Sequence, residues 1–165
     1  MVQVRVAGVA VDGAGDHVIL LKPLDDLPGE GRVLPIWIGS QEATSILIAV
    51  EGAQAPRPLA HDLMQAMLTS LGATVARVEV TRIEDGTFYA EITIAASGNV
   101  VLDARPSDAV ALASRTGAPI FVADDVLAEA GIVDITADED EPAAEENVEE
   151  FKRFLDSVDP DDFRG

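Results

Sequence analysis

Residues 74–95 read TVARVEVTRIEDGTFYAEITIA, two runs rich in Val, Ile, Thr, Phe and Tyr on either side of Glu84-Asp85-Gly86. These residue types favour strands, and Asp-Gly between two such runs is typical of a two-residue hairpin turn. The stretch therefore predicts an antiparallel hairpin with strands at 74–83 and 87–95, and the rest of the chain can be placed around it.

More strands are predicted on both sides of this hairpin. Residues 2–11 and 17–24 are rich in Val, Ile and Leu and are joined by the turn sequence DGAGD, which predicts a second hairpin. Residues 33–38 predict a third strand, and Pro35 within it indicates an edge strand or a bulge because proline cannot donate to a ladder. Short strands are expected at 100–104 and 119–123.

Four segments have the spacing and end signals of helices: 40–52, 61–71, 105–117 and 124–130. Ser40 is the expected cap of the first. The second carries apolar residues at helical spacing, which predicts one buried stripe made of Leu63, Met64, Met67, Leu68 and Leu71. The pattern predicts an α+β fold, with a mixed or antiparallel sheet as its core and flanking helices.

The length of 165 residues fits a single domain with one core. We expect that domain to span residues 1–133 and an acidic tail to span residues 134–165. Residues 137–146 have too little apolar surface to pack and predict a linker. Apolar residues then recur at helical spacing and predict a short C-terminal helix over 145–157.

The net charge is −19, to which residues 1–133 contribute −9 and residues 134–165 contribute −10. Such a field repels phosphate backbones, whereas proteins that bind nucleic acids gain much of their affinity from Lys and Arg. Charge therefore argues against a nucleic-acid ligand. If one binds, we expect a local basic pocket within the acidic molecule.

The chain has no cysteine, which excludes disulfides, thiolate zinc sites and cysteine nucleophiles. Its start, MVQVRV, alternates like a strand and differs from a signal peptide, and no apolar run approaches the roughly 20 residues that span a bilayer. We therefore predict a cytoplasmic protein without a membrane partner. Abundant β-branched strand surface predicts a homo-oligomer, either a dimer or a trimer.

Three blocks carry a family resemblance: LPIWIG at 34–39 followed by Glu42-Ala43, RPLAHDL at 57–63, and DARPSDAVALA at 103–113. Together they resemble the bifunctional nuclease domain family over roughly residues 1–133. The resemblance implies an α+β domain that hydrolyses phosphodiester bonds of RNA, DNA or both. The cofactor stays open, with a divalent cation such as Mg or Mn as the candidate.

The blocks contain the residue types that phosphodiester hydrolysis needs, namely a base and groups that stabilise phosphate charge. The catalytic candidates are His61, Asp62, Asp103 and Asp108. Candidate contacts to substrate phosphate are Arg57, Arg105 and Ser107, the last at a helix start where amides also bind anions. No metal ligand set is assigned, because the sequence has no HExxH, EF-hand or P-loop motif.

Each candidate also has a structural interpretation. Asp62 and Asp108 stand at helix starts, where carboxylates cap amides. Asp103 and Arg105 lie two apart on an extended segment and can pair with each other. Two other functions therefore stay open: a non-catalytic homo-oligomeric interaction or regulatory domain, in which Trp37 covers an edge or anchors an interface, and a binder of a small anionic metabolite.

Overall fold

The computed structural model describes residues 1–27, 29–134, 153, 156 and 157. Its strands are β1 (Val2–Val11), β2 (His17–Pro23), β3 (Arg32–Ile38), β4 (Thr74–Glu84), β5 (Thr87–Ala95), β6 (Asn99–Ala104), β7 (Ile120–Val122) and β8 (Ile132–Val133). Its helices are α1 (Ser40–Val50), α2 (Ala60–Ser70), α3 (Pro106–Thr116) and α4 (Asp124–Ala130). The α+β prediction is confirmed.

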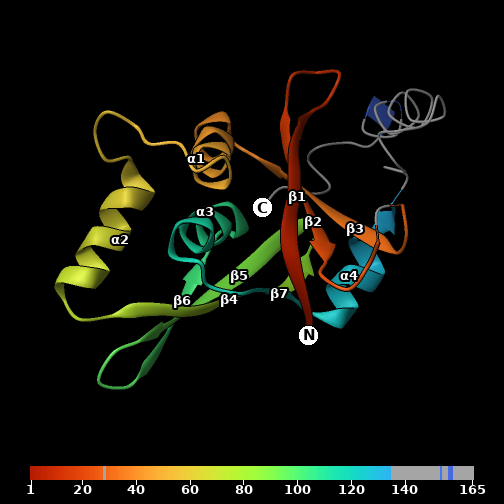
Figure 1. Cartoon of the computed structure of the whole chain (residues 1–165). Coiled ribbons are helices and arrows are strands. Elements are labelled where there is room, and N and C mark those ends of the chain that lie inside the picture. Colours follow the sequence, from red (N-terminus) through yellow and green to blue (C-terminus); the bar gives the residue numbers. More distant parts are fainter. Residues whose placement is uncertain (28, 135–152, 154–155, 158–165) are drawn as a thin grey trace.

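The eight strands form one sheet in the order β6-β5-β4-β7-β1-β2-β3-β8 (Figure 1). Neighbouring strands are antiparallel except β4 and β7, which run parallel. The sheet is therefore mixed, as the sequence predicts. It consists of two antiparallel halves, β1 to β3 and β4 to β6, that are joined through the short β7.

The two predicted hairpins are present, and each has a physical cause in its turn. Asp85 and Gly86 both have positive φ, 49° and 75°, which is what a two-residue hairpin turn requires. In the β1–β2 turn, the carboxylate of Asp12 accepts hydrogen bonds from the backbone N–H groups of Ala14 and Asp16 at 3.0 and 2.8 Å. Positive φ at two residues therefore sets the β4–β5 turn, and hydrogen bonds to the Asp12 carboxylate set the β1–β2 turn.

The position of β3 in the sheet shows how Pro35, from which an edge strand or a bulge was predicted, is accommodated. Strand β3 pairs along its length with β2, where Pro35 lies opposite Leu20, but β8 pairs only with Arg32 and Val33. Pro35 therefore lies on a stretch whose second edge has no partner strand among the described residues. The prediction that Trp37 covers an edge or anchors an interface is wrong: its side chain is 2% exposed and its indole N–H donates to Asp12 at 3.0 Å.

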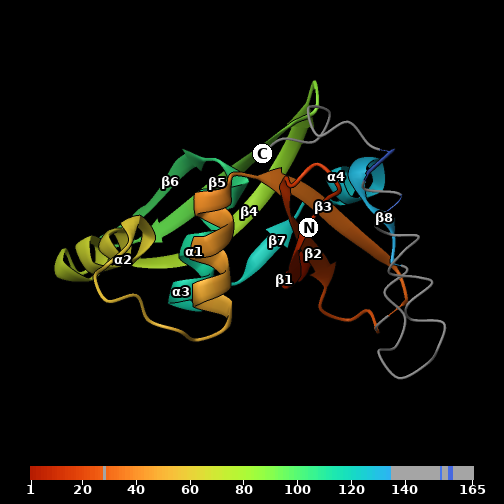
Figure 2. The ribbon, with the colours of Figure 1, turned by 90° about the horizontal axis from the view of Figure 1, so that it is seen from above.

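Helices α1 and α2 flank α3, and α3 lies on β4 and β5 (Figures 1 and 2). The main core forms between this helical layer and the sheet. A smaller cluster on the other face of the sheet contains Val18, Leu20, Val33 and Trp37. Strands β2 and β3 are thus buried on both faces, which explains why their sequences are apolar almost without interruption.

Helix α2 buries a different face from the one predicted, and Leu68 is the one residue of the predicted stripe that packs against the core. Four residues of the expected buried stripe are exposed, by 41 to 79%: Leu63, Met64, Met67 and Leu71. The face toward α3 instead carries the buried His61 together with Gln65 and Leu68, which are half-buried. Polar contacts of this inner face, described below, orient the helix, so the apolar stripe stays on the surface.

Two smaller predictions also differ from the structure. Ser40 is the first residue of α1 rather than its cap. Gly39 occupies the cap position, and because glycine has no side chain, it makes no side-chain cap hydrogen bond. The predicted linker at 137–146 and the helix at 145–157 fall outside the described residues, apart from Arg153, Asp156 and Ser157, which are helical. Within the described part of the chain, no helix is long and apolar enough to cross a membrane.

Candidate functional site

A pocket of about 580 Å³ opens where the starts of α1, α2 and α3 converge. All three sequence blocks meet here, the first through Glu42, because α1 and α2 both pack on α3. The wall is formed by Ser40, Gln41, Glu42, Thr44, Ser45, Leu59, Ala60, His61, Met64, Arg105 and Asp108. Three predicted site residues, His61, Asp108 and Arg105, are therefore brought together although they come from two separate helices.

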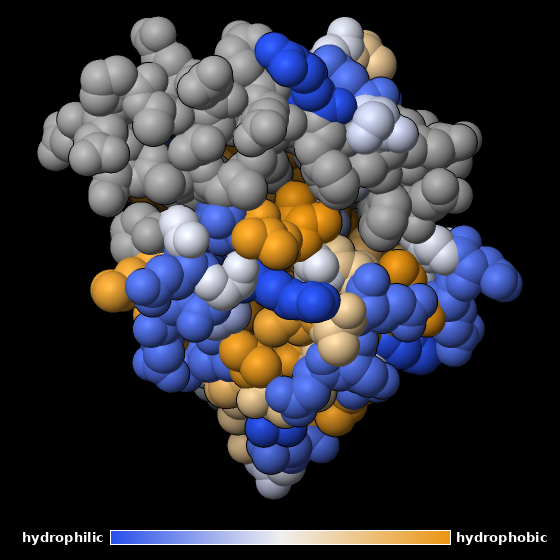
Figure 3. All heavy atoms as spheres, turned by 90° about the vertical axis from the view of Figure 1, so that its right-hand side faces the viewer, coloured by the Kyte–Doolittle hydropathy of each residue, from blue (hydrophilic) through white to orange (hydrophobic). Residues whose placement is uncertain are grey.

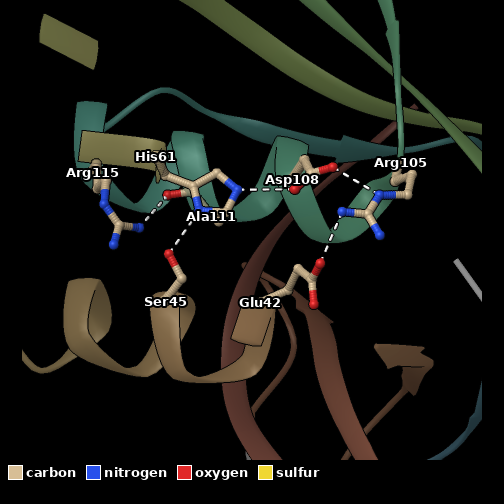
Figure 4. A network of polar contacts seen from close by, with 7 residues as sticks. All are labelled: Glu42, Ser45, His61, Arg105, Asp108, Ala111 and Arg115. Atoms are coloured by element: carbon tan, nitrogen blue, oxygen red, sulfur yellow. Dashed lines mark hydrogen bonds and ion pairs between the residues drawn. The ribbon is translucent and has the colours of Figure 1, made fainter. Parts of the chain in front are cut away.

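His61 is the centre of a hydrogen-bonded chain across the pocket wall (Figure 4). Its Nδ1 lies 2.7 Å from the Ser45 hydroxyl oxygen, and its Nε2 lies 2.9 Å from Oδ1 of Asp108. The imidazole is 5% exposed and Ser45 is 4% exposed. Both ring nitrogens thus have partners, and these partners fix the orientation of the ring.

Arg105 extends this chain to a second carboxylate (Figure 4). Its Nε donates to Oδ2 of Asp108 at 2.8 Å, and its Nη2 donates to Oε1 of Glu42 at 2.9 Å. The Arg105 side chain is 58% exposed, whereas the side chains of Glu42 and Asp108 are more buried. The order of contacts is therefore Ser45, His61, Asp108, Arg105 and Glu42.

The protonation of this chain follows from its contacts. Burial opposes ionisation of Asp108, but hydrogen bonds from Arg105 and His61 outweigh it, so the pKa of Asp108 lies below its usual value. Hydrogen bonds to Asp108 and Glu42 raise the pKa of Arg105. Asp108 is therefore ionised and acts only as an acceptor toward His61.

Asp62 belongs to a different contact. Its Oδ2 accepts from the backbone N–H of Leu59 at 2.9 Å, which caps α2, and its Oδ1 accepts from Nε of Arg115 at 2.7 Å. The hydrogen bond from Arg115, with that from Leu59, holds the pKa of Asp62 below its usual value. The capping interpretation of Asp62 agrees with this geometry.

The other predicted residues do not line the pocket. Arg57 is exposed on the segment between α1 and α2, and Asp103 is exposed on β6. The expected pairing of Asp103 with Arg105 is not formed, because Arg105 caps α3 and reaches forward to Asp108 instead. Ser107 is 1% exposed, and its hydroxyl has no hydrogen-bond partner among the described residues.

The charges of the pocket differ from the expectation of a basic site. Its wall carries one guanidinium, Arg105, which is already paired with two carboxylates, Glu42 and Asp108. A bound divalent cation does not fit these residues well either, since no group of three or more His, Asp or Glu suited to a metal occurs in the described ranges. The guanidinium occupies the position between the carboxylates.

Ser45 is the functional residue that sequence reasoning misses. It lies in the middle of α1 beside Ile46 on the buried face, where a small polar residue is normally interpreted as part of the core packing. Glu42 lies in the first turn of α1, where an acidic side chain is favourable for the helix itself, so its sequence position alone does not indicate a site. A signal existed in the spacing, because Ser45 lies three residues after Glu42 and therefore on the same face of α1.

Comparisons with known proteins cover this region. Residues 24–134 match the family model of the bifunctional nuclease domain. An uncharacterized protein of Mycobacterium tuberculosis (strain ATCC 25618 / H37Rv) is 44% identical over 168 residues, covering 99% of this chain and 99% of that protein. Bifunctional nuclease 1 of Oryza sativa subsp. japonica and Bifunctional nuclease 1 of Arabidopsis thaliana are each 31% identical over 115 residues, covering 67% of this chain and 34% of each plant protein.

Proposed function

Because the chain belongs to the bifunctional nuclease domain family, we propose that it hydrolyses phosphodiester bonds of RNA, DNA or both in the pocket between α1, α2 and α3. The observation that carries the proposal is the hydrogen-bonded chain from Ser45 through His61 to Asp108 in the pocket wall. All its members lie within the segment that matches the family. We also propose that this activity is cytoplasmic.

The contacts of His61 define its role in the proposed reaction. An ionised Asp108 accepts a hydrogen bond from Nε2–H, so Nδ1 keeps its lone pair and accepts a hydrogen bond from the Ser45 hydroxyl. A histidine held in this way by a carboxylate is suited to remove a proton from a hydroxyl group. His61 is therefore the general base, Asp108 is its positioning residue and Ser45 is the nucleophile.

The proposed reaction has two steps. The Ser45 oxygen attacks phosphorus while its proton moves to Nδ1 of His61; the bond from phosphorus to the leaving nucleotide oxygen breaks, and that oxygen takes the proton. Water then attacks the phosphoserine ester, gives a proton to His61, and releases the phosphate end of the product as the Ser45 oxygen is reprotonated. Each step is a proton transfer coupled to phosphoryl transfer.

Arg105 is the proposed phosphate contact. Its hydrogen bonds to Asp108 and Glu42 use only part of the five donors of a guanidinium, and the Arg105 side chain is 58% exposed, so N–H groups remain for phosphate oxygens. Arg57 is a second proposed contact, since it is exposed two residues before Leu59 of the pocket wall. Asp62, Asp103 and Ser107 receive no catalytic role.

The acidic surroundings limit how substrate binds. With two carboxylates and one guanidinium in the wall, the pocket does not concentrate a polyanion, and affinity depends little on released counterions. We therefore propose that single-stranded substrates bind weakly and with a small salt dependence. This distinguishes the site from a basic groove that follows a nucleic-acid backbone.

A matched pair of aspartates tests the proposal. Cleavage of labelled single-stranded RNA and DNA is measured for the wild type, Asp108→Asn and Asp103→Asn, with and without Mg²⁺ or Mn²⁺. Loss of the positioning residue should lower kcat/KM by about 100-fold or more. Asp103→Asn makes the same change outside the pocket and should leave kcat/KM at the wild-type value. An inactive wild type, or equal activities of the two variants, would contradict the proposal.

A non-catalytic interaction domain is the second candidate function. It is favoured by the apolar face of α2, which is exposed in the single chain, and by the net charge of −19, which suits nucleic acids poorly. It predicts a wild type that associates but cleaves neither RNA nor DNA in the same assay.

A further inference from the structure

Two segments at one end of the described structure contain no charged residue. Residues 63–76, from α2 into β4, and residues 92–102, from β5 into β6, contain no Asp, Glu, Lys, Arg or His, although 25% of the chain is charged. The two segments are neighbours in space, because Val75 pairs with Ile94 and Ile94 pairs with Val100. We call these residues the uncharged end; they lie at the left of Figures 1 and 2.

The uncharged end also gathers exposed apolar side chains. More than half of the exposed large hydrophobic residues in the described part of the chain lie there: Leu63, Met64, Met67, Leu71, Val100, Val101 and Leu102. Each is at least 41% exposed. The opposite side, with β3 and α4, instead mixes hydrophobic and hydrophilic residues (Figure 3). Exposed apolar side chains gathered at one end in this way are typical of an interaction site.

Strand β6 gives this surface an open edge. It pairs only with β5, and no strand lies on its other side among the described residues. Proteins usually protect such an edge with charges or proline, yet four of the six residues of β6, Asn99 to Leu102, carry neither, and the exposed Asp103 is its single charged residue. Its backbone is therefore available to another strand.

We propose that a second copy of this chain covers the uncharged end, with β6 of the two copies antiparallel about a two-fold axis and the α2 stripes in contact. An axis perpendicular to the sheet reverses the strand but keeps both α2 helices on the same face of the joined sheet. One patch then meets itself, as a symmetric dimer requires. The proposal does not depend on catalysis.

An unpaired strand edge and an apolar stripe in one patch can each meet their own copy about a two-fold axis, which favours a second copy of the chain as the occupant. Two molecules that each carry −19 repel each other, and the repulsion costs least where they meet at a surface without charges. The size also fits: of the 25 residues in the two segments, five are buried (Ala73, Val75, Ile92, Thr93 and Ile94), and the remaining 20 are at the lower end of the roughly 20 to 30 that a standard interface uses on each side. Met64 belongs both to this surface and to the pocket wall, so the interface borders the pocket.

Sedimentation velocity on the full chain tests the proposal. The wild type should sediment as a dimer in the micromolar range, and Met67→Glu should raise the dimer dissociation constant at least about 10-fold, because it places a charge in an apolar contact. Val101→Lys tests the strand side of the interface in the same way. Leu27→Glu is the matched control: Leu27 is 63% exposed and Met67 is 56% exposed, but Leu27 lies outside the uncharged end.

Salt gives an independent readout. Screening the repulsion between two acidic copies should tighten a dimer held by apolar contacts, whereas salt weakens an interface held by ion pairs. Circular dichroism confirms that each variant is folded. A monomeric wild type, or dimerisation unchanged by both Met67→Glu and Val101→Lys, overturns the proposal. Because the readout is mass, its failure is distinguishable from a failure of nuclease activity.

Discussion

Substituting Asp62→Asn removes the charged partner of a buried arginine and so decides whether Asp62 is structural or catalytic. The Arg115 side chain is 5% exposed, and Asp62 accepts from its Nε at 2.7 Å. Another donor of Arg115 reaches the carbonyl of Ala111 at 3.0 Å, and its Nη2 has no hydrogen-bond partner among the described residues. Asp62 is therefore the carboxylate that balances this buried charge.

The expected loss of stability follows from these contacts. Removing one partner of a fully buried ion pair costs about 3 to 5 kcal/mol, and we take about 2 kcal/mol here because water reaches Asp62, whose side chain is 36% exposed. Asparagine can still accept from the N–H of Leu59, so the cap on α2 is kept. Asp62→Ala removes the cap as well and should cost about 1 kcal/mol more.

Stability is measured by urea unfolding, followed by the fluorescence of Trp37, the single tryptophan. Because the pKa of Asp62 is lowered in the folded protein, its contribution is present above the unfolded value, near 3.8, and is lost as pH falls through the folded value. The difference in free energy of unfolding between the wild type and Asp62→Asn should therefore have its full value at pH 7 and decrease below about pH 4.

The opposite pattern would refute this reasoning. If Asp62→Asn unfolds at the same urea concentration as the wild type but loses cleavage activity, Asp62 acts on the substrate rather than on Arg115. Asp103→Asn, which makes the same change at an exposed site on β6, controls for the loss of one charge.

Three other substitutions have defined expectations. Lys22→Ala leaves Asp134 without its buried ammonium partner and should cost about 3 to 5 kcal/mol in urea unfolding. Trp37→Phe removes the indole donor to a buried carboxylate and should cost about 1.5 to 3 kcal/mol, measured by circular dichroism. Glu42→Gln frees Arg105 from one carboxylate and should tighten binding of a labelled oligonucleotide about 3-fold or more in fluorescence anisotropy; unchanged or weaker binding would contradict Arg105 as the phosphate contact.

Local sequence patterns suffice to predict the strands and hairpins, but they do not predict the order of the strands in the sheet. The Asp85-Gly86 turn and the alternating runs around it specify a hairpin within a few residues, because the turn itself requires positive φ. The parallel pairing of β4 with β7 joins Val78 to Ile120, and no local pattern encodes a contact over that distance. The fold class was therefore predictable, whereas the sheet topology was not.

The prediction of which face of α2 is buried was wrong for a different reason. Hydrophobic periodicity assumes that the apolar face of a helix is the buried one. In α2 the hydrogen bond from His61 to Asp108 and the ion pair of Asp62 with Arg115 hold the polar face against α3. Buried polar contacts between segments distant in sequence cannot be read from the periodicity of one helix.

The candidate site was predicted in residue type but not in geometry. His61, Asp108 and Arg105 were candidates from the family resemblance, yet nothing in the sequence assigns Asp108 rather than Asp62 to the imidazole. The alternation that placed Asp103 and Arg105 on one face ends at Arg105, because α3 begins at the next residue. Its side chain consequently lies beside Asp108, three residues on.

The position of β7 has a consequence for biosynthesis. This three-residue strand, Ile120–Val122, lies between β1 and β4 and is what connects the two halves of the sheet. A ribosome adds about 5 to 20 residues per second, so β1 waits on the order of 10 s for its neighbour to be made. During that interval the nascent chain exposes an unsatisfied strand edge, which makes it a candidate client for chaperones that protect incomplete sheets.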